Sequence, residues 1–303
     1  AARLAQQYGL QWPVVTSAAT ARTQINQESL LTSHRLRSKW GHYLSGVIYY
    51  EGEWYWGIDR LHHLEDRLNA LGLSKQTHLA REGQRAPLFL TPQFQSLGPV
   101  PEGTSIDFFL SLRSPYSAIS CAKLFPWAKA NGVQINLRYV LPMVMRGLPV
   151  PAEKRKYISL DAAREAFVQG VPFGRLNDPV GKPTERGLAL IPFAQMHELA
   201  EDYVMSFMQG VWSEGLDAGT DAHLKIIVER CGLHWQAAKD ILKSQSNEQH
   251  WRAVAEQNRQ ALFALGLWGV PSFKFEDTAV WGQDRFWVIE KALHDRFDLP
   301  PSH

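Results

Sequence analysis

The chain has 303 residues, 45% of them hydrophobic, and its 32 Lys and Arg side chains nearly balance its 30 Asp and Glu side chains. This length and apolar content favour one large or two ordinary folded domains over disorder. A net charge of +2 gives no case for binding nucleic acid or an acidic membrane surface. No apolar run approaches the roughly 18 residues of a membrane-spanning helix, and no basic-then-apolar stretch in this sequence predicts a signal peptide. We therefore expect neither a nucleic-acid partner nor a membrane partner.

The two cysteines, Cys121 and Cys231, have neither CxxC spacing nor a neighbouring pair of histidines. The histidines of the second half do not group at metal-ligand spacing either, and no metal site is predicted; they include His197, His223 and His234. Cys121 lies two helical turns after Ser114, and we interpret it as a small buried apolar residue.

An internal repeat begins early in the chain. Residues 41–68 fall on residues 266–293 without a gap at an offset of 225, with identity at eight of 28 positions. The identities include Trp56-Gly57-x-Asp59-Arg60 opposite Trp281-Gly282-x-Asp284-Arg285. A second match, at offset 161, sets residues 1–9 against residues 162–170. Residues 1–88 are therefore predicted to be the back part of a degenerate copy of a domain that is complete at residues 104–300.

The front copy has no counterpart of residues 105–161, and the two offsets make its helical part 64 residues shorter. A hairpin with a turn at Glu51-Gly52 is predicted within it. Because such a hairpin needs partner strands, we expect the chain to begin inside a domain whose remainder lies upstream or comes from another chain. Three prolines and two glycines without helical periodicity predict an extended linker at residues 89–103.

The complete copy begins with a β-α-β pattern. Residues 105–112 are apolar enough for a central strand buried on both faces. Ser114 is a good N-cap before Pro115, and a helix should run to about Ala130 and stop at Asn131-Gly132. Residues 133–140 predict a second strand, reached by a right-handed crossover.

A helical insertion should occupy about residues 147–250. Residues 152–248 are helix-rich, with predicted breaks at 170–183 and 214–220. Residues 254–265 then lead into a strand after Gly269-Val270-Pro271, a hairpin turning at Glu276-Asp277, and a last helix at residues 286–295.

The motifs together resemble a known superfamily. They are a strand, Ser114-Pro115-Tyr116-Ser117 at a helix start, Gly269-Val270-Pro271-Ser272-Phe273, and Trp281-Gly282-Gln283-Asp284-Arg285. This combination, over residues 104–298, resembles the DsbA-like thioredoxin superfamily, and most closely its kappa-class glutathione transferases and 2-hydroxychromene-2-carboxylate isomerases. The resemblance implies an α/β thioredoxin-like fold with a helical insertion, preceded here by a partial degenerate second copy. Disulfide oxidoreductase chemistry is excluded at this site, because both positions of its Cys-Pro-x-Cys motif are hydroxyls.

The resemblance implies glutathione as cofactor and Ser114 as the group that stabilises its thiolate. A helix N-terminus favours negative charge, although Ser-Pro is also an ordinary helix cap. By the same likeness Tyr157 lines the pocket of a small-molecule substrate and acts in catalysis, and Lys154 binds a carboxylate of glutathione or substrate. The alternative for Lys154 is a solvated basic face.

Pro271 would be the cis proline of the fold, which turns the Val270 backbone outward to pair with glutathione as an added strand. The alternative is that Pro271 only shapes the entry to the strand. Asp284 resembles the residue that holds the γ-glutamyl amino group, with Gln283 offering a neutral hydrogen bond. A partly structural role competes, because the Asp-Arg pair persists in the front copy, where Gly46 replaces Pro271.

Two functions remain open. The first is a glutathione-dependent isomerase or transferase acting on a small electrophilic or aromatic-derived substrate. The second is a catalytically silent DsbA-like tandem that binds a protein or peptide. It is favoured by the degenerate front copy, by Arg113 beside Ser114, and by the lack at 145–149 of an Asn typical of the isomerases. A cytoplasmic location is expected because a glutathione site suits a reducing compartment. The sequence leaves a homodimer open.

Overall fold

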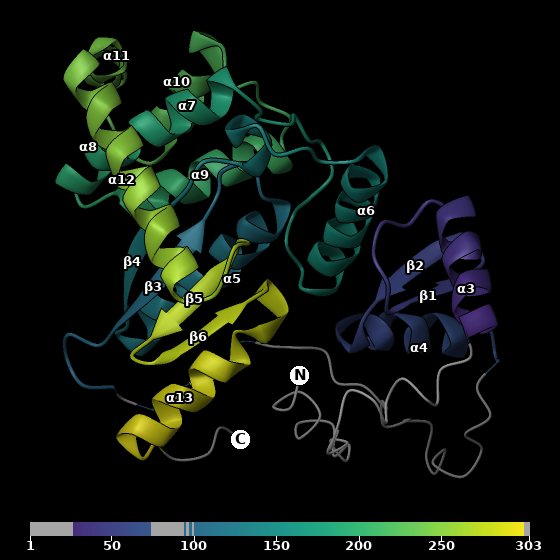
Figure 1. Ribbon diagram of the computed structural model, residues 1–303. Helices are drawn as coiled ribbons and strands as arrows, with labels where there is room; N and C mark the ends of the chain where they lie inside the picture. Colours follow the sequence, from purple (N-terminus) through teal and green to yellow (C-terminus); the bar gives the residue numbers. More distant parts are fainter. Residues whose placement is uncertain (1–26, 74–93, 95–96, 99, 300–303) are drawn as a thin grey trace. The chain divides into compact units, whose positions relative to one another are not determined.

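The structure is a computed structural model that describes residues 27–73, 94, 97–98 and 100–299 (Figure 1). The offset-161 match at residues 1–9 and most of the predicted linker lie outside the described residues. The chain divides into two compact units. Unit 1 holds residues 27–73 and 151–157, and unit 2 holds the described residues of 92–150 and 158–299.

Unit 1 is built around one antiparallel hairpin. Its elements are α3 (Gln27–Lys39), β1 (Val47–Tyr50), β2 (Glu53–Trp56), the 3-10 turn η1 (Ile58–Arg60) and α4 (Leu61–Ala70). The hairpin pairs Tyr50 with Glu53, and its turn is formed by Glu51 and Gly52, both at positive φ. The predicted hairpin turn is confirmed.

The sheet of unit 2 has the order β4-β3-β5-β6. Its strands are β3 (Ser105–Leu110), β4 (Gln134–Tyr139), β5 (Ser272–Phe275) and β6 (Thr278–Trp281). β3 runs parallel to β4 and antiparallel to β5, and β5 runs antiparallel to β6. The β-α-β unit and the C-terminal hairpin match the prediction, except that β3 ends at Leu110 rather than at residue 112.

Helix α5 (Pro115–Asn131) connects β3 to β4. Gly132 ends it in the left-handed conformation at φ 69, as the Asn-Gly pair predicts. The ring of Phe108 in β3 stacks on the ring of Phe273 in β5, with ring centres 5.2 Å apart. It also meets the ring of Phe125 in α5 edge-on, with ring centres 6.1 Å apart. Part of the core of unit 2 therefore lies between the sheet and α5, and the same buried cluster continues into the helices of the insertion.

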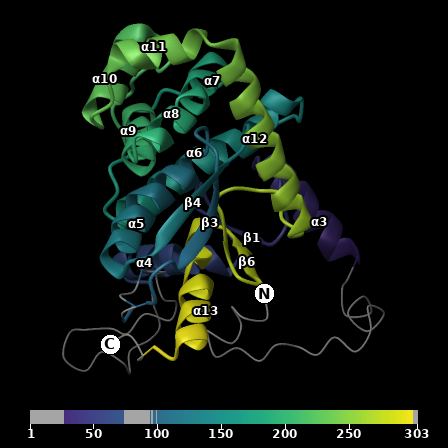
Figure 2. The same cartoon turned by 90° about the vertical axis from the view of Figure 1, so that its left-hand side faces the viewer.

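The insertion is helical, as predicted. It comprises α6 (Ala152–Val168), α7 (Lys182–Ala189), α8 (Ile191–Met196), α9 (Ala200–Trp212), α10 (Asp221–Arg230), α11 (Trp235–Lys243) and α12 (Gln245–Ala264), after the 3-10 turn η2 (Met143–Arg146). Figure 2 shows α7 to α11 gathered at one end of the sheet, with α13 (Trp287–Phe297) at the other. Both predicted breaks are confirmed, because α6 ends before residue 170 and α9 ends before residue 214.

The described part of the predicted linker contributes to the core of unit 2. The ring of Phe94 stacks on Phe286 at 4.5 Å, and Leu97 is buried with its backbone N–H bonded to Asn131 Oδ1 at 2.8 Å. In the described parts of the chain, every helix is too short or too polar to cross a membrane.

Candidate functional site

The candidate site lies at the carboxyl end of β3. Since β3 and β4 are parallel, their carboxyl ends share one edge of the sheet, with Leu110 opposite Tyr139. β5 runs the other way with Ser272 opposite Phe109, so Val270 and Pro271 enter the sheet at that edge. α5 also starts there, directly after Ser114. The topology therefore brings Ser114, Val270 and Pro271 to one end of the sheet.

Ser114 is half-buried and caps α5. Its Oγ accepts a hydrogen bond from the Ser117 N–H at 3.1 Å. Among the described residues, the Ser114 hydroxyl donates to no acceptor, so its proton remains available. Ser117, by contrast, is fully buried, and its Oγ accepts a weak bond from the Ser111 N–H at 3.4 Å. Of the two hydroxyls in Ser-Pro-Tyr-Ser, Ser114 is the one able to meet a ligand.

The Val270–Pro271 peptide bond is cis. The Pro271 carbonyl accepts a bond from the Gly282 N–H at 3.0 Å, which ties the loop to the end of β6. Neither the N–H nor the C=O of Val270 enters a backbone hydrogen bond with another described residue. A half-buried backbone with both groups unused can pair with an extended peptide.

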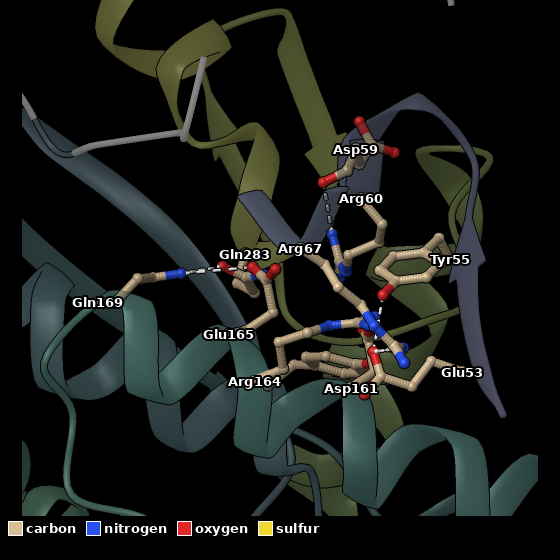
Figure 3. A network of polar contacts seen from close by, with 11 residues as sticks. Glu53, Tyr55, Asp59, Arg60, Arg67, Asp161, Arg164, Glu165, Gln169 and Gln283 are labelled. Atoms are coloured by element: carbon tan, nitrogen blue, oxygen red, sulfur yellow. Dashed lines mark hydrogen bonds and ion pairs between the residues drawn. The ribbon is translucent and has the colours of Figure 1, made fainter. Parts of the chain in front are cut away.

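Gln283 belongs to the 3-10 turn η3 (Gln283–Arg285), which packs against α5. Its Nε2 donates to Glu165 Oε2 at 2.6 Å, and its Oε1 accepts from Gln169 Nε2 at 3.0 Å (Figure 3). Both ends of the amide are therefore engaged inside the protein. Asp284 is also buried, and its carboxylate folds back over Gly282.

Two buried acids on α6 were missed as site components by sequence reasoning. Asp161 accepts bonds from the Tyr116 hydroxyl and from Arg164 Nη2, each at 2.7 Å. Glu165 accepts the bond from Gln283 (Figure 3). Tyr116 is the variable residue of Ser-Pro-x-Ser, so α6 is bonded directly to the first turn of α5. Asp161 and Glu165 stand one turn apart beside the buried alanines Ala162 and Ala166. The four-residue spacing of Asp161 and Glu165 next to two alanines was the signal in the sequence that could have identified them.

Lys154 and Tyr157 are grouped with unit 1, whereas Ser114 belongs to unit 2. The Lys154 ammonium lies 5.8 Å from the centre of the Tyr43 ring, and burial lowers the pKa of Lys154. The buried Tyr157 meets the His42 ring edge-on at 4.7 Å. These two predicted site residues therefore pack within an aromatic cluster of unit 1.

Arg113 and Cys121 have structural partners near the start of α5. Arg113 forms a two-pronged ion pair with Asp178, at 2.7 Å and 2.6 Å, which neutralises the charge next to Ser114. Cys121 is fully buried, as predicted, and burial strongly raises the pKa of its thiol. Neither offers a nucleophile at the site.

Comparison with known proteins places this geometry in context. The family model described as DSBA-like thioredoxin domain matches residues 105–294. A 2-hydroxychromene-2-carboxylate isomerase of Sphingobium xenophagum is 25% identical over 199 residues, which is 63% of this chain and 98% of that protein. The protein of the same name from Pseudomonas putida is 22% identical over 196 residues, covering 62% and 93%.

Solved structures give the same picture of the fold. A selenomethionine 2-hydroxychromene-2-carboxylate isomerase superimposes with a TM-score of 0.55 at 21% identity, covering 64% of this chain and 96% of that chain. The cytosolic disulfide reductase DsbM from Pseudomonas aeruginosa gives 0.50 at 15% identity, covering 64% and 97%. Unit 2 therefore has the thioredoxin-like fold predicted from the sequence.

Proposed function

Because this chain belongs to the DsbA-like thioredoxin domain family, we propose that it is a glutathione-dependent isomerase of the 2-hydroxychromene-2-carboxylate class. The names of two relatives support the reaction class. The observation that carries the proposal is the unused hydroxyl proton of Ser114 at the N-terminus of α5. A transferase acting on a small electrophile would use Ser114 in the same way.

Ser114 can cap the helix and serve a ligand at once. Its oxygen accepts the Ser117 N–H, and its hydrogen stays free to donate to a sulfur. The N-terminal end of a 17-residue helix adds partial positive charge at the same point. Both effects favour a thiolate over a thiol, and so lower the pKa of a thiol bound there.

Val270 provides the second support for the cofactor. Its free N–H and C=O can hold the extended backbone of a tripeptide and orient its cysteine toward Ser114. Bound glutathione would supply the thiol that adds to the substrate and leaves again unconsumed. Asp284 would accept from the γ-glutamyl amino group, while Gln283 acts through its Glu165 bond to fix η3.

The test compares two serine caps of the same kind. Ser244 caps α12 by accepting the Asn247 N–H at 3.2 Å, as Ser114 caps α5. Each of Ser114→Ala and Ser244→Ala should cost about 1 kcal/mol of stability. Only Ser114→Ala should weaken glutathione binding measured by calorimetry and remove the thiolate absorbance of the bound cofactor at neutral pH.

Isomerase turnover of 2-hydroxychromene-2-carboxylate should fall by about 10²-fold or more in Ser114→Ala, the loss typical of one transition-state donor. The proposal would be contradicted if glutathione bound neither the wild type nor any variant. It would also be contradicted if the thiol of bound glutathione had the same pKa in Ser114→Ala as in the wild type.

A catalytically silent peptide binder is the second candidate, favoured by the engaged amide of Gln283 and by the grouping of Lys154 and Tyr157 with unit 1. Such a protein would bind extended peptides at Val270 regardless of their thiol. S-methylglutathione separates the two: a binder holds it as tightly as glutathione, whereas a thiolate site prefers glutathione.

A further inference from the structure

The loop after β4 carries an arginine whose charge is not neutralised. Arg146 is the last residue of η2, and its Nε is buried without a hydrogen-bond acceptor. Among the described residues it enters no ion pair. A guanidinium N–H that is desolvated and has no hydrogen-bond acceptor is costly, and such groups in native structures call for a ligand or a role.

The surroundings of Arg146 strengthen this inference. Arg259 and Glu256 lie on α12, and their charges reach Arg146: burial lowers the pKa of Arg146 most, Arg259 lowers it further, and Glu256 opposes them. Glu256 is already held by both prongs of Arg259 and by Gln260 Nε2 at 3.1 Å. Its carboxylate is therefore committed elsewhere, and the cluster keeps an excess positive charge.

The backbone that leads to Arg146 leaves β4 at the carboxyl edge of the sheet. The Val140 N–H bonds the Leu110 carbonyl at 2.9 Å, so the chain leaving β4 stays beside the end of β3. Asn258 of α12 donates to the Tyr139 carbonyl at 3.0 Å, and η2 is closed by the Leu148 N–H bonding the Met143 carbonyl at 3.1 Å. Ligands of open α/β sheets bind outside this edge.

We propose that Arg146 binds the carboxylate of an aromatic substrate at the edge of the sheet where Ser114 begins α5. Arg146 lies within residues 145–149, the stretch that has no Asn of the kind typical of the isomerases, and it provides a positively charged group there. Arg113 is paired with Asp178 and Arg164 with Asp161, so neither can do this. A planar guanidinium matches a carboxylate with two parallel hydrogen bonds. This inference deepens the proposed function and rests on it for the identity of the substrate.

The direct test uses non-reactive probes. Cinnamate and its uncharged amide, cinnamamide, are titrated by calorimetry into the wild type, Arg146→Gln, Arg146→Lys and Arg296→Gln. The last is a matched control, because Arg296 pairs with Glu276 on the surface of α13. Cinnamate should bind the wild type and Arg296→Gln at least about tenfold more tightly than cinnamamide, as charged hydrogen bonds imply. Arg146→Gln should lose that preference, and Arg146→Lys should keep part of it.

A wild type without preference for the anion, or an Arg146→Gln variant that retains it, overturns the assignment. Glutathione is titrated into the same proteins, and its affinity should be unchanged in Arg146→Gln. If Arg146→Gln weakened glutathione binding as much as cinnamate binding, Arg146 would belong to the glutathione site and the assignment would also be overturned. A wild type that binds cinnamate through Arg146 but does not isomerise 2-hydroxychromene-2-carboxylate would refute the proposed function and leave the anion site standing. Circular dichroism of each variant confirms folding, and Arg146→Lys keeps the test decisive if Arg146→Gln unfolds.

Discussion

Two hairpin–helix segments of this chain can be compared position by position. Each boundary of β5, β6 and η3 lies 225 residues after the matching boundary of β1, β2 and η1. Glu51 and Glu276 begin the two hairpin turns at φ 41 and 46. The N–H of Gly57 bonds the Gly46 carbonyl at 3.0 Å, just as the N–H of Gly282 bonds the Pro271 carbonyl at 3.0 Å. The local hydrogen bonding of the two segments is therefore the same.

Their surroundings differ. β5 is paired with β3 and contributes a fully buried Phe273, whereas β1 pairs with β2 alone among the described strands and its Ile48 is 43% exposed. Pro271 in one segment corresponds to Gly46 in the other, and Gln283 corresponds to Ile58. The comparison teaches that the hairpin and its caps are set by local sequence, while burial and a candidate binding edge depend on β3 and α5.

The largest expected effect comes from removing one side chain at matched strand positions. Phe273→Ala should destabilise unit 2 by about 3–5 kcal/mol, because it empties a closely packed site against Phe108. Ile48→Ala should cost only about 1 kcal/mol, because Ile48 is 43% exposed and less apolar area is lost there. Denaturant unfolding together with hydrogen exchange of each hairpin measures both, and equal losses would mean that β1 has a partner strand equivalent to β3.

A smaller difference is expected at the matched glycines before the 3-10 turns. An added Cβ at Gly282, at φ 111, would lie 2.5 Å from Asp284 Oδ1; at Gly57, at φ 68, it would lie 3.8 Å from Asp59 Oδ2. Gly282→Ala should therefore cost about 2–3 kcal/mol and Gly57→Ala about 1 kcal/mol. Thermal unfolding of the two variants gives the order, and a reversed order would show that Asp284 moves aside freely.

The smallest effect concerns the hairpin turns. Glu51→Gly should stabilise its hairpin by about 0.5 kcal/mol, since glycine relieves the left-handed conformation but adds entropy to the unfolded chain. Glu276→Gly should gain less, because it also removes the exposed ion pair with Arg296 at 2.8 Å. Hydrogen exchange of the turn amides reports both changes. A larger gain at Glu276 than at Glu51 would indicate that the ion pair contributes nothing.

Sequence reasoning succeeded where structure is encoded locally. Ser114, Pro115 and Gly132 delimit α5 through capping and backbone preference, and these signals act within a few residues. The break after α6 and the two hairpin turns have the same local origin. The division of the insertion into α7, α8 and α9 was not predicted, because those short helices are separated by residues whose conformation is decided by packing.

The site was predicted only in part, for a related reason. The bonds from Gln283 to Glu165 and Gln169 join residues 118 and 114 positions apart, and no spacing in the sequence encodes them. Arg146 was noted only as part of a stretch without an expected Asn, since its lack of an anionic partner is visible only once α12 is in position. The pairing of Arg113 with Asp178 similarly depends on a contact between distant segments.

The paired hydroxyls at the start of α5 have a consequence for oxidative stress. Hydroxyl groups cannot pass through the sulfenic, sulfinic and sulfonic states that inactivate exposed cysteine enzymes. The thiol of Cys121 is sealed in the core, and burial also raises the pKa of Cys231, which keeps both sulfurs protonated and slow to react with peroxide. The protein's own cysteines are thus poor targets for peroxide, and a reactive sulfur at this site would be borrowed from a diffusible molecule and could be replaced after damage.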